Sequence, residues 1–149
     1  MDRFQELLWD LGEVIELPLH VDKNNACKIV IQEKLSIQLE MDSSHERLLA
    51  AAFISELPPG KFRENVLKEA MKTNNSYHPF GIFAYIEKIN SLILYHYLMA
   101  DQLNGEKLAD FLELFIEEAE SWQSAISMGT PAPPQHLKPD KEQPPPFIK

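Results

Sequence analysis

The chain has 149 residues, of which 44% are hydrophobic, and a formal net charge of −9, which suits one globular domain with a real core. This acidic balance argues against nucleic-acid binding, which needs a basic surface, and against binding to an anionic membrane surface. A basic or neutral protein partner remains compatible with it. Cys27 is the only cysteine, so no internal disulfide can form and we expect a cytoplasmic protein. We see no secretory signal and no apolar run of about 20 residues, so no integral membrane association is expected.

Residues 3–16 are predicted to form an amphipathic helix that ends before Pro18. Trp9 and Leu17 lie beside its apolar stripe and are expected to widen the apolar surface. The opposite face is acidic. The residues of the stripe follow i, i+3, i+4, i+7 spacing and are Phe4, Leu7, Leu8, Leu11, Val14 and Ile15.

Two stretches in which apolar and polar residues alternate, 26–32 and 35–41, are predicted to be strands. The short link at Glu33-Lys34 fits a hairpin between them. Residues 48–54 are apolar on both faces, so we expect a third strand at the centre of a sheet, with alanines that leave room for a bulky neighbour. The motif Leu57-Pro58-Pro59-Gly60 ends this strand.

Residues 61–74 are predicted to form a short second helix, whose apolar face includes Met71. Two more strands are expected over 82–87 and 92–98, around a turn at Asn90-Ser91. Aromatic residues, which favour cross-strand packing and interfaces alike, are frequent in this pair of strands. They are Phe83, Tyr85, Tyr95 and Tyr97.

The last predicted helix begins near Asn104-Gly105 and ends near Met128-Gly129, with a broad apolar stripe and an acidic outer face. We expect one domain over residues 1–128 and a Pro-rich flexible tail over residues 129–149, which is either solvating or a second interaction segment. The order α-β-β-β-α-β-β-α, with hairpin-length links, predicts an α+β fold: a twisted antiparallel sheet packed with three helices.

The sequence contains no motif that indicates catalysis, so we predict that the protein is not an enzyme and needs neither a metal nor a cofactor. No two histidines have the spacing of metal ligands, and His45-Glu46 lacks the second histidine of a zinc-protease motif, because Leu49 stands there. Cys27 lies on the expected buried face of a strand and is interpreted as a core residue. A small enzyme remains an alternative if the fold gathers His78, His96 and carboxylates in one pocket.

Several short motifs occur in an order that resembles the class I type III secretion chaperones, the Tir-chaperone-like family of Gram-negative bacteria. The similarity covers roughly residues 1–128. The motifs lie between the predicted elements or within them. They are Leu17-Pro18-Leu19, Cys27-Lys28-Ile29-Val30-Ile31, Leu35-Ser36-Ile37-Gln38-Leu39-Glu40, Leu57-Pro58-Pro59, Asn74-Asn75 and Ala119-Glu120-Ser121-Trp122.

The resemblance implies a small acidic homodimer in the bacterial cytoplasm, without enzymatic activity. Such a dimer binds the N-terminal segment of secreted effectors, keeps it extended and soluble, and delivers it to the export apparatus, with the secretion ATPase as a further candidate partner. Binding would combine strand addition with the docking of helices in apolar grooves. The alternative is an adaptor or regulatory module of the same fold that holds a protein which is not secreted.

Two groups of apolar residues are the candidate sites. The first helix and first strands carry more apolar residues than one face of a small sheet can bury, so we expect an exposed groove for the effector, although each member could instead be core. Its candidates are Phe4, Leu8, Leu17, Leu19 and Val30. The second helix and the aromatic strands are the expected homodimer interface, which would be isologous. Its candidates are Phe62, Val66, Ala70, Phe83 and Tyr85.

Overall fold

The computed structural model describes residues 2–44 and 46–134, and its order of elements confirms the predicted α+β fold. The chain forms three helices, five strands and two short 3-10 turns. In chain order the elements are α1 (Arg3–Ile15), β1 (Ala26–Ile31), β2 (Leu35–Met41), β3 (Arg47–Glu56), α2 (Lys61–Asn74), β4 (Ile82–Ile86), η1 (Glu87–Ile89), β5 (Ser91–Met99), η2 (Ala100–Gln102) and α3 (Gly105–Ser127).

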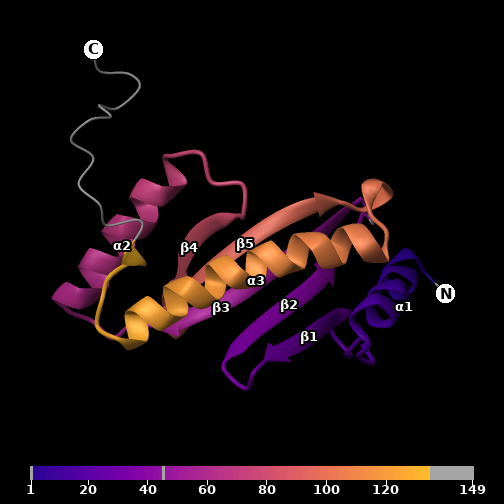
Figure 1. The fold of residues 1–149 in the computed structure, drawn as a ribbon, viewed down its shortest axis with the longest axis horizontal. Helices are drawn as coiled ribbons and strands as arrows, with labels where there is room; N and C mark the ends of the chain where they lie inside the picture. The colour runs from indigo at the N-terminus through magenta and orange to yellow at the C-terminus, as the bar shows by residue number, and fades with distance from the viewer. Residues whose placement is uncertain (1, 45, 135–149) are drawn as a thin grey trace, which may run out of the picture.

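The five strands form one antiparallel sheet in the order β1-β2-β3-β5-β4, so β1 and β4 are its two edges. Helix α3 runs along the sheet and packs against β3, α1 packs against α3 at the β1 end, and α2 lies along β4 (Figure 1). The molecule therefore has two ends, each built from one edge strand and one helix.

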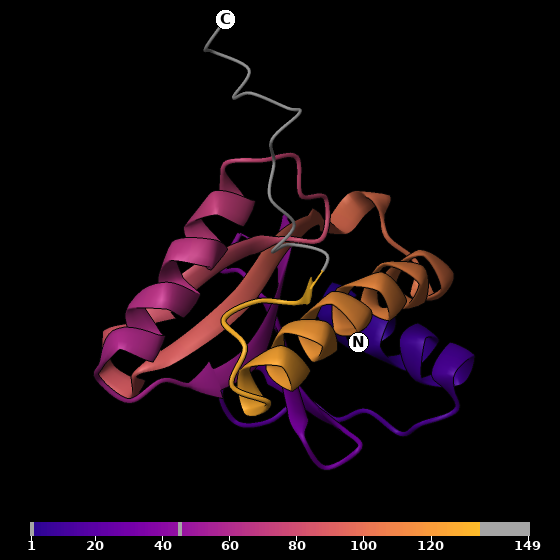
Figure 2. The same cartoon turned by 60° about the vertical axis from the view of Figure 1, so that its left-hand side comes forward.

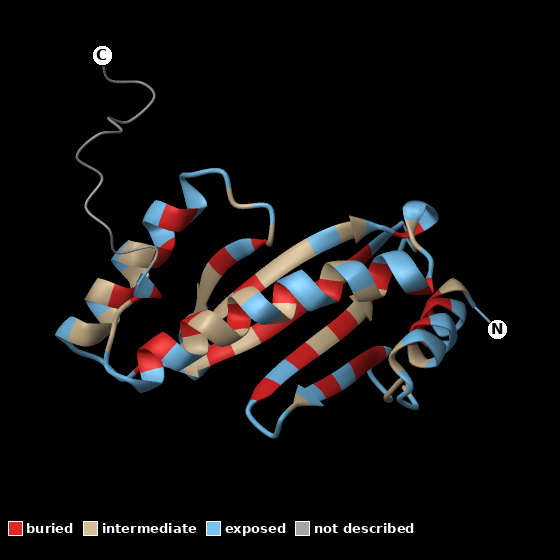
Figure 3. Ribbon diagram, in the orientation of Figure 1, coloured by how far each residue is buried: buried red, intermediate tan, exposed pale blue. Residues whose placement is uncertain are grey.

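Helix α3 can approach the centre of the sheet because β3 presents small side chains to it. Ala50 and Ala52 are fully buried, as are Phe115 and Trp122 on the facing helix. Small residues opposite large ones give the interdigitated packing of a protein core. Buried residues occur along α3 and along the central strands (Figure 3), and they belong to one hydrophobic cluster. The strand order confirms the prediction that β3 lies at the centre of the sheet.

Local sequence signals explain where several elements begin and turn. Helix α1 starts with a capping box, in which Asp2 accepts from the backbone of Gln5 and the Gln5 side chain accepts from the backbone of Asp2. The β1–β2 hairpin turns through Gln32 and Glu33, which both have positive φ, as a type I′ turn requires, and the Lys34 N–H closes the turn on the Ile31 carbonyl. The hairpin expected at this place is confirmed although it contains no glycine.

The chain after α3 packs back onto the domain instead of leaving it at once. It passes between α3 and α2 (Figure 2), where the Thr130 N–H donates to the Ala125 carbonyl over 2.9 Å and Ala132 is fully buried. Residues 130–133 thus lie against the domain, and the division expected after residue 128 stays a prediction. The rest of the predicted Pro-rich tail, residues 135–149, lies outside the described residues.

Candidate binding surfaces

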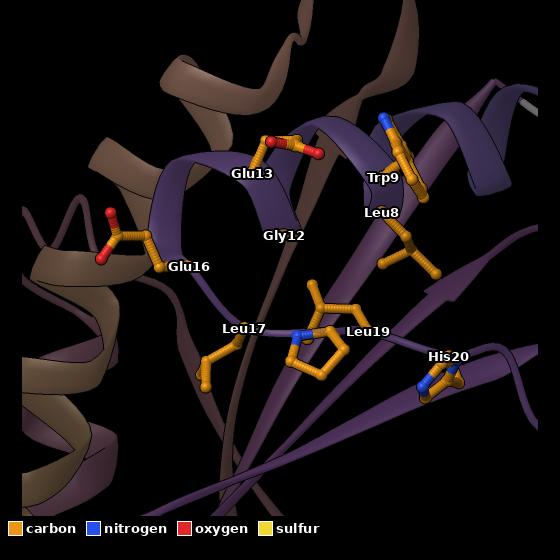
Figure 4. Close-up of a pocket in the computed structure, with 9 residues that line it drawn as sticks. Leu8, Trp9, Gly12, Glu13, Glu16, Leu17, Leu19 and His20 are labelled. Carbon is orange, nitrogen blue, oxygen red and sulfur yellow. The ribbon is translucent and has the colours of Figure 1, made fainter.

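A groove lies between α1 and the extended segment that follows it. We name it the α1 groove; its volume is about 550 Å³. Side chains of the helix and of the segment line it (Figure 4), with Leu8 between the two. The lining residues are Leu8, Trp9, Gly12, Glu13, Glu16, Leu17, Pro18, Leu19 and His20.

The end of α1 sets the path of this segment. Glu16 adopts the left-handed conformation, with φ of 59°, and the Leu17 N–H donates to the Gly12 carbonyl over 3.1 Å. A Cβ at position 12 would lie 2.7 Å from the Leu17 carbonyl oxygen, so only glycine allows so close an approach. The chain therefore turns back under its own helix and opens a groove there.

The α1 groove combines exposed apolar surface with negative charge. Trp9 is 63% exposed and Leu17 is 50% exposed, while Glu13 and Glu16 add two carboxylates to the lining. Large apolar side chains that lie together at the surface of a soluble protein usually mark a site for a partner. Such a groove suits an apolar side chain of a partner that also carries basic residues.

The edge of β1 begins where the α1 groove ends. The backbone of His20 lies close enough to the Cys27 thiol to oppose the rise in its pKa, which places the segment under α1 near the start of β1. Both backbone groups of Ala26 bond to Asp22, so they point away from β2. Because backbone direction alternates along an antiparallel strand, those of Lys28 and Val30 also point outward.

No hydrogen bond within the described ranges occupies the outward backbone groups of Lys28 and Val30. The side chain of Val30 is 60% exposed beside them. A strand that ends a sheet in this way can pair with a further extended chain. The β1 end of the molecule thus offers an open strand edge that is continuous with an apolar groove.

The structure divides the five residues expected in the effector groove into two sets. The expected exposure of Phe4 and Leu8 is wrong: Phe4 is 1% exposed and Leu8 is 3% exposed, because α1 packs this stripe against α3 and the core. Leu8 still lines the wall of the groove. Leu17 and Val30 are exposed, and Leu19 is half-buried. A role in binding stays a prediction for all five.

Trp9 is the groove residue that the set of candidates omitted. The sequence carries a signal for it, because Trp9 lies off the apolar stripe of α1, between Leu8 and Asp10 in the chain. An aromatic side chain among the polar positions of an amphipathic helix has no core to enter.

A second apolar groove lies at the other end of the sheet, between α2 and β4; its volume is about 230 Å³. We name this region, together with the exposed Ile82, the α2–β4 surface. Met71, which the sequence placed on the apolar face of the second helix, is 65% exposed there. The groove is lined by Leu67, Ala70, Met71, Asn74, Phe83, Ala84, Tyr85 and Leu92.

The residues expected at the dimer interface are mostly buried within the protomer. Val66, Ala70 and Phe83 belong to the core, which contradicts their expected availability at the surface, although Ala70 and Phe83 form part of the groove wall. Phe62 and Tyr85 are half-buried. Dimer formation through these five residues is still a prediction.

In the described part of the chain, the titratable side chains do not gather into a metal-binding cluster. His96 stacks on Phe111 with ring centroids 5.2 Å apart, and burial lowers its pKa. Burial raises the pKa of the Cys27 thiol, with Asp22 adding to the rise and the His20 backbone opposing it, so Cys27 is a poor nucleophile. Among residues 2–44 and 46–134, no three His, Cys, Asp or Glu side chains could hold a metal together.

His78 links the segment before β4 to helix α3. Its Nδ1 lies 2.8 Å from the Gly81 carbonyl, and its Nε2 lies 3.3 Å from Oε1 of Glu118 on α3. Burial favours the neutral ring, but the hydrogen bonds to Glu118 and Gly81 and the charge of Glu118 outweigh it and raise the pKa of His78. The pair fixes the segment before β4 to α3, and Glu118 also lines a pocket of about 100 Å³.

The chain matches one protein family and several solved structures. A model of the Tir chaperone protein (CesT) family matches residues 6–123. A chain in the HopA1–SchA chaperone–effector complex matches with 21% identity and a TM-score of 0.67, covering 83% of this chain and 94% of that one. A chain in the ExsC–ExsE complex matches with 25% identity and a TM-score of 0.66, covering 81% of this chain and 90% of that one.

A third solved structure, the Yersinia pestis type III secretion chaperone SycH with a stable fragment of YscM2, matches with 16% identity and a TM-score of 0.60. The match covers 78% of this chain and 97% of that one. A comparison with curated protein sequences found no match. No helix in the described part of the chain is long and apolar enough to cross a membrane.

Proposed function

Because this chain belongs to the Tir chaperone protein (CesT) family, whose members are chaperones without catalytic activity, we propose that it serves type III secretion in the cytoplasm of a Gram-negative bacterium. It binds the N-terminal segment of an effector, keeps that segment extended and soluble, and presents it to the export apparatus. The structural matches support this role, since chains of chaperone–effector complexes share the fold.

The observation that carries the proposal is the continuity of the α1 groove with the open edge of β1. An effector segment that adds a strand beside Lys28 and Val30 gains backbone hydrogen bonds for any sequence. Every second side chain of the added strand would face the same way, so one such row could supply an anchor for the groove that Trp9 and Leu17 line. Each well-buried apolar side chain contributes about 1.5–3 kcal/mol, so one or two anchors would add sequence preference to the backbone hydrogen bonds.

The carboxylates of the α1 groove favour basic residues in the client segment. Glu13 and Glu16 line the groove beside the exposed indole of Trp9. A client segment with Lys or Arg next to its apolar anchor gains from these charges, and that gain falls as salt is added. We therefore expect clients whose N-terminal region combines apolar and basic residues.

The second part of the proposal is a homodimer that uses the α2–β4 surface. Met71 and Ile82 are exposed there next to half-buried Leu67 and Ala84, which gives an apolar patch on the outside of the protomer. When such a patch meets its own copy across a two-fold axis, each of its apolar side chains is buried once in each protomer. The two α1 grooves then remain free for the client.

The test is to identify what the full-length protein retains from its native host. Mass spectrometry of the co-purified material should find the N-terminal region of a secreted protein, bound to the wild type and lost from Leu17→Asp. Leu114→Asp is the matched control, because Leu114 on α3 is 52% exposed and Leu17 is 50% exposed. If both variants keep the partner, the groove is misplaced. A partner that is never secreted would favour the adaptor function instead.

A further inference from the structure

One side chain of α2 occupies the outer edge of β4. The Nδ2 of Asn74 donates to the Phe83 carbonyl over 2.9 Å, and the Phe83 N–H donates to the Oδ1 of Asn74 over 2.8 Å. One carboxamide thus satisfies both backbone groups of one strand residue. In an antiparallel sheet, the peptide groups of a neighbouring strand would bond to this N–H and this carbonyl instead.

The position of Asn74 matters because few outward groups remain on this short strand. The backbone groups of Phe83 point to Asn74, so they point away from β5, and by alternation those of Tyr85 also point outward. A further strand would have to lie about 4.8 Å from β4, which is where the last turn of α2 holds its carboxamide. A pairing chain would need to displace both Asn74 and the helix end.

The first turn of α2 is fastened to the same strand. Arg63 donates to the Tyr85 hydroxyl over 2.9 Å, and that hydroxyl donates to the Asn90 side chain over 2.8 Å. Side chains at both ends of α2 therefore hold the helix along β4. This matters because α2 has no side-chain N-cap.

We infer that Asn74 closes the β4 edge, so that each protomer accepts an extended client strand at β1 alone. A second copy then meets the α2–β4 surface through side chains rather than through backbone pairing. The inference rests on the proposed function and adds which of the two sheet edges is available to a client. Exposed edges invite unwanted pairing, and a polar side chain that occupies their hydrogen bonds is an effective block.

The first experiment needs no client. Hydrogen exchange of the Phe83 amide is measured in the wild type, in Asn74→Ala and in the neighbouring control Asn75→Ala. We expect exchange at least about tenfold faster in Asn74→Ala alone, since two hydrogen bonds are lost. Asn74→Asp keeps an acceptor for the Phe83 N–H and should stay protected, which separates the bond from general loosening of α2. Equal exchange in Asn74→Ala and Asn75→Ala would overturn the inference.

The second experiment uses the client segment identified by co-purification, added to the wild-type protein in its native oligomeric state. Binding should slow exchange at Lys28 and Val30 and leave Tyr85 as it was before addition. Slower exchange at Tyr85 would overturn the closed β4 edge while the proposed function stands. Protection at neither edge would contradict strand addition itself, and with it the binding mode proposed above.

Discussion

The β1 end and the β4 end of this sheet both expose large apolar side chains, but they differ in their backbone. At β1 the outward groups of Lys28 and Val30 have no partner among the described residues, and the α1 groove continues from them. At β4 the side chain of Asn74 takes the outward groups of Phe83. We propose that the β1 end pairs with an extended chain and that the β4 end meets its partner mainly through side chains.

The difference teaches that apolar exposure alone does not tell which kind of partner a surface takes. Strand addition recognises main chain and is tolerant of sequence, which suits a client held without its fold. An interface made of side chains selects shape, which suits a copy of the same protein. The four predictions below test this division, from the largest expected effect to the smallest.

The largest effect should come from Phe4, which lies at the β1 end but belongs to the core. Phe4→Ala should lower the free energy of unfolding by about 3–5 kcal/mol, because it leaves a cavity among buried residues. Trp9→Ala, on the same helix, should cost no more than about 0.5 kcal/mol, since the indole is mostly exposed. Urea unfolding measures both. Similar losses in the two variants would erase the distinction between core and groove in α1.

The β4 end is tested next by Met71→Asp. A charge in the centre of the proposed interface should weaken the dimer at least about tenfold, because it would be buried without a partner charge. Sedimentation at several concentrations gives the dimer constant, and client binding by the monomer should persist. Tyr77→Asp is the control, as Tyr77 lies just beyond α2 and is the most exposed of the large apolar residues described. An unchanged dimer in Met71→Asp would move the interface elsewhere.

The shape of the α1 groove is tested by Gly12→Ala. The added Cβ would lie 2.7 Å from the Leu17 carbonyl oxygen, so the segment under α1 must move outward. We expect roughly tenfold weaker client binding and a loss of stability of about 1 kcal/mol, with the dimer unchanged. Glu13→Ala alters the groove charge on the next residue without touching that carbonyl and serves as the control. Titration of the client segment at two salt concentrations separates the two effects.

Most of the fold could be predicted from the sequence because its elements have strong periodicity and clear ends. The alternation in 35–41 and the prolines at 58 and 59 each reflect a local rule, and the structure places β2 and the end of β3 accordingly. The central place of β3 followed from its apolar character on both faces. These signals need no knowledge of distant contacts.

The division between core and surface could be predicted less well, because it depends on which element covers which. Phe4 and Trp9 lie on one helix, and only the packing of α1 on α3 decides that the first is buried and the second exposed. Met71 lies on the predicted apolar face of α2 but is exposed for the same reason, since only a narrow face of Val66, Ala70 and Thr73 is buried. Hydrophobic periodicity shows which residues form the apolar stripe of a helix, but not how many of them a neighbouring element buries.

The hydrogen bonds between Asn74 and Phe83 were beyond sequence analysis altogether. Asn74 reads as an ordinary residue at the end of a helix, and nine positions separate it from Phe83. Only the path of the chain between α2 and β4 brings the carboxamide to the strand. That path depends in part on His78, which packs the intervening segment onto α3.

The smallest expected effect is therefore a pH dependence at His78. The pKa of this histidine is raised in the folded chain, because hydrogen bonds to Glu118 and Gly81 and the charge of Glu118 outweigh the effect of burial. The folded state then binds the proton more tightly than the unfolded state, whose histidine titrates near pH 6.5. The resulting stabilisation is full below that pH and is lost as the pH rises through the folded pKa.

His78→Gln should remove this dependence: above about pH 6.5 its free energy of unfolding should fall less steeply with pH than that of the wild type. His96 titrates with the opposite sign, because burial lowers its pKa, but it is present in both proteins and cancels in their difference. Urea unfolding from pH 5.5 to about pH 8 gives the two slopes. Parallel slopes would show that the His78–Glu118 pair does not hold the segment, and the β4 end would then depend on Arg63 and Asn74 alone.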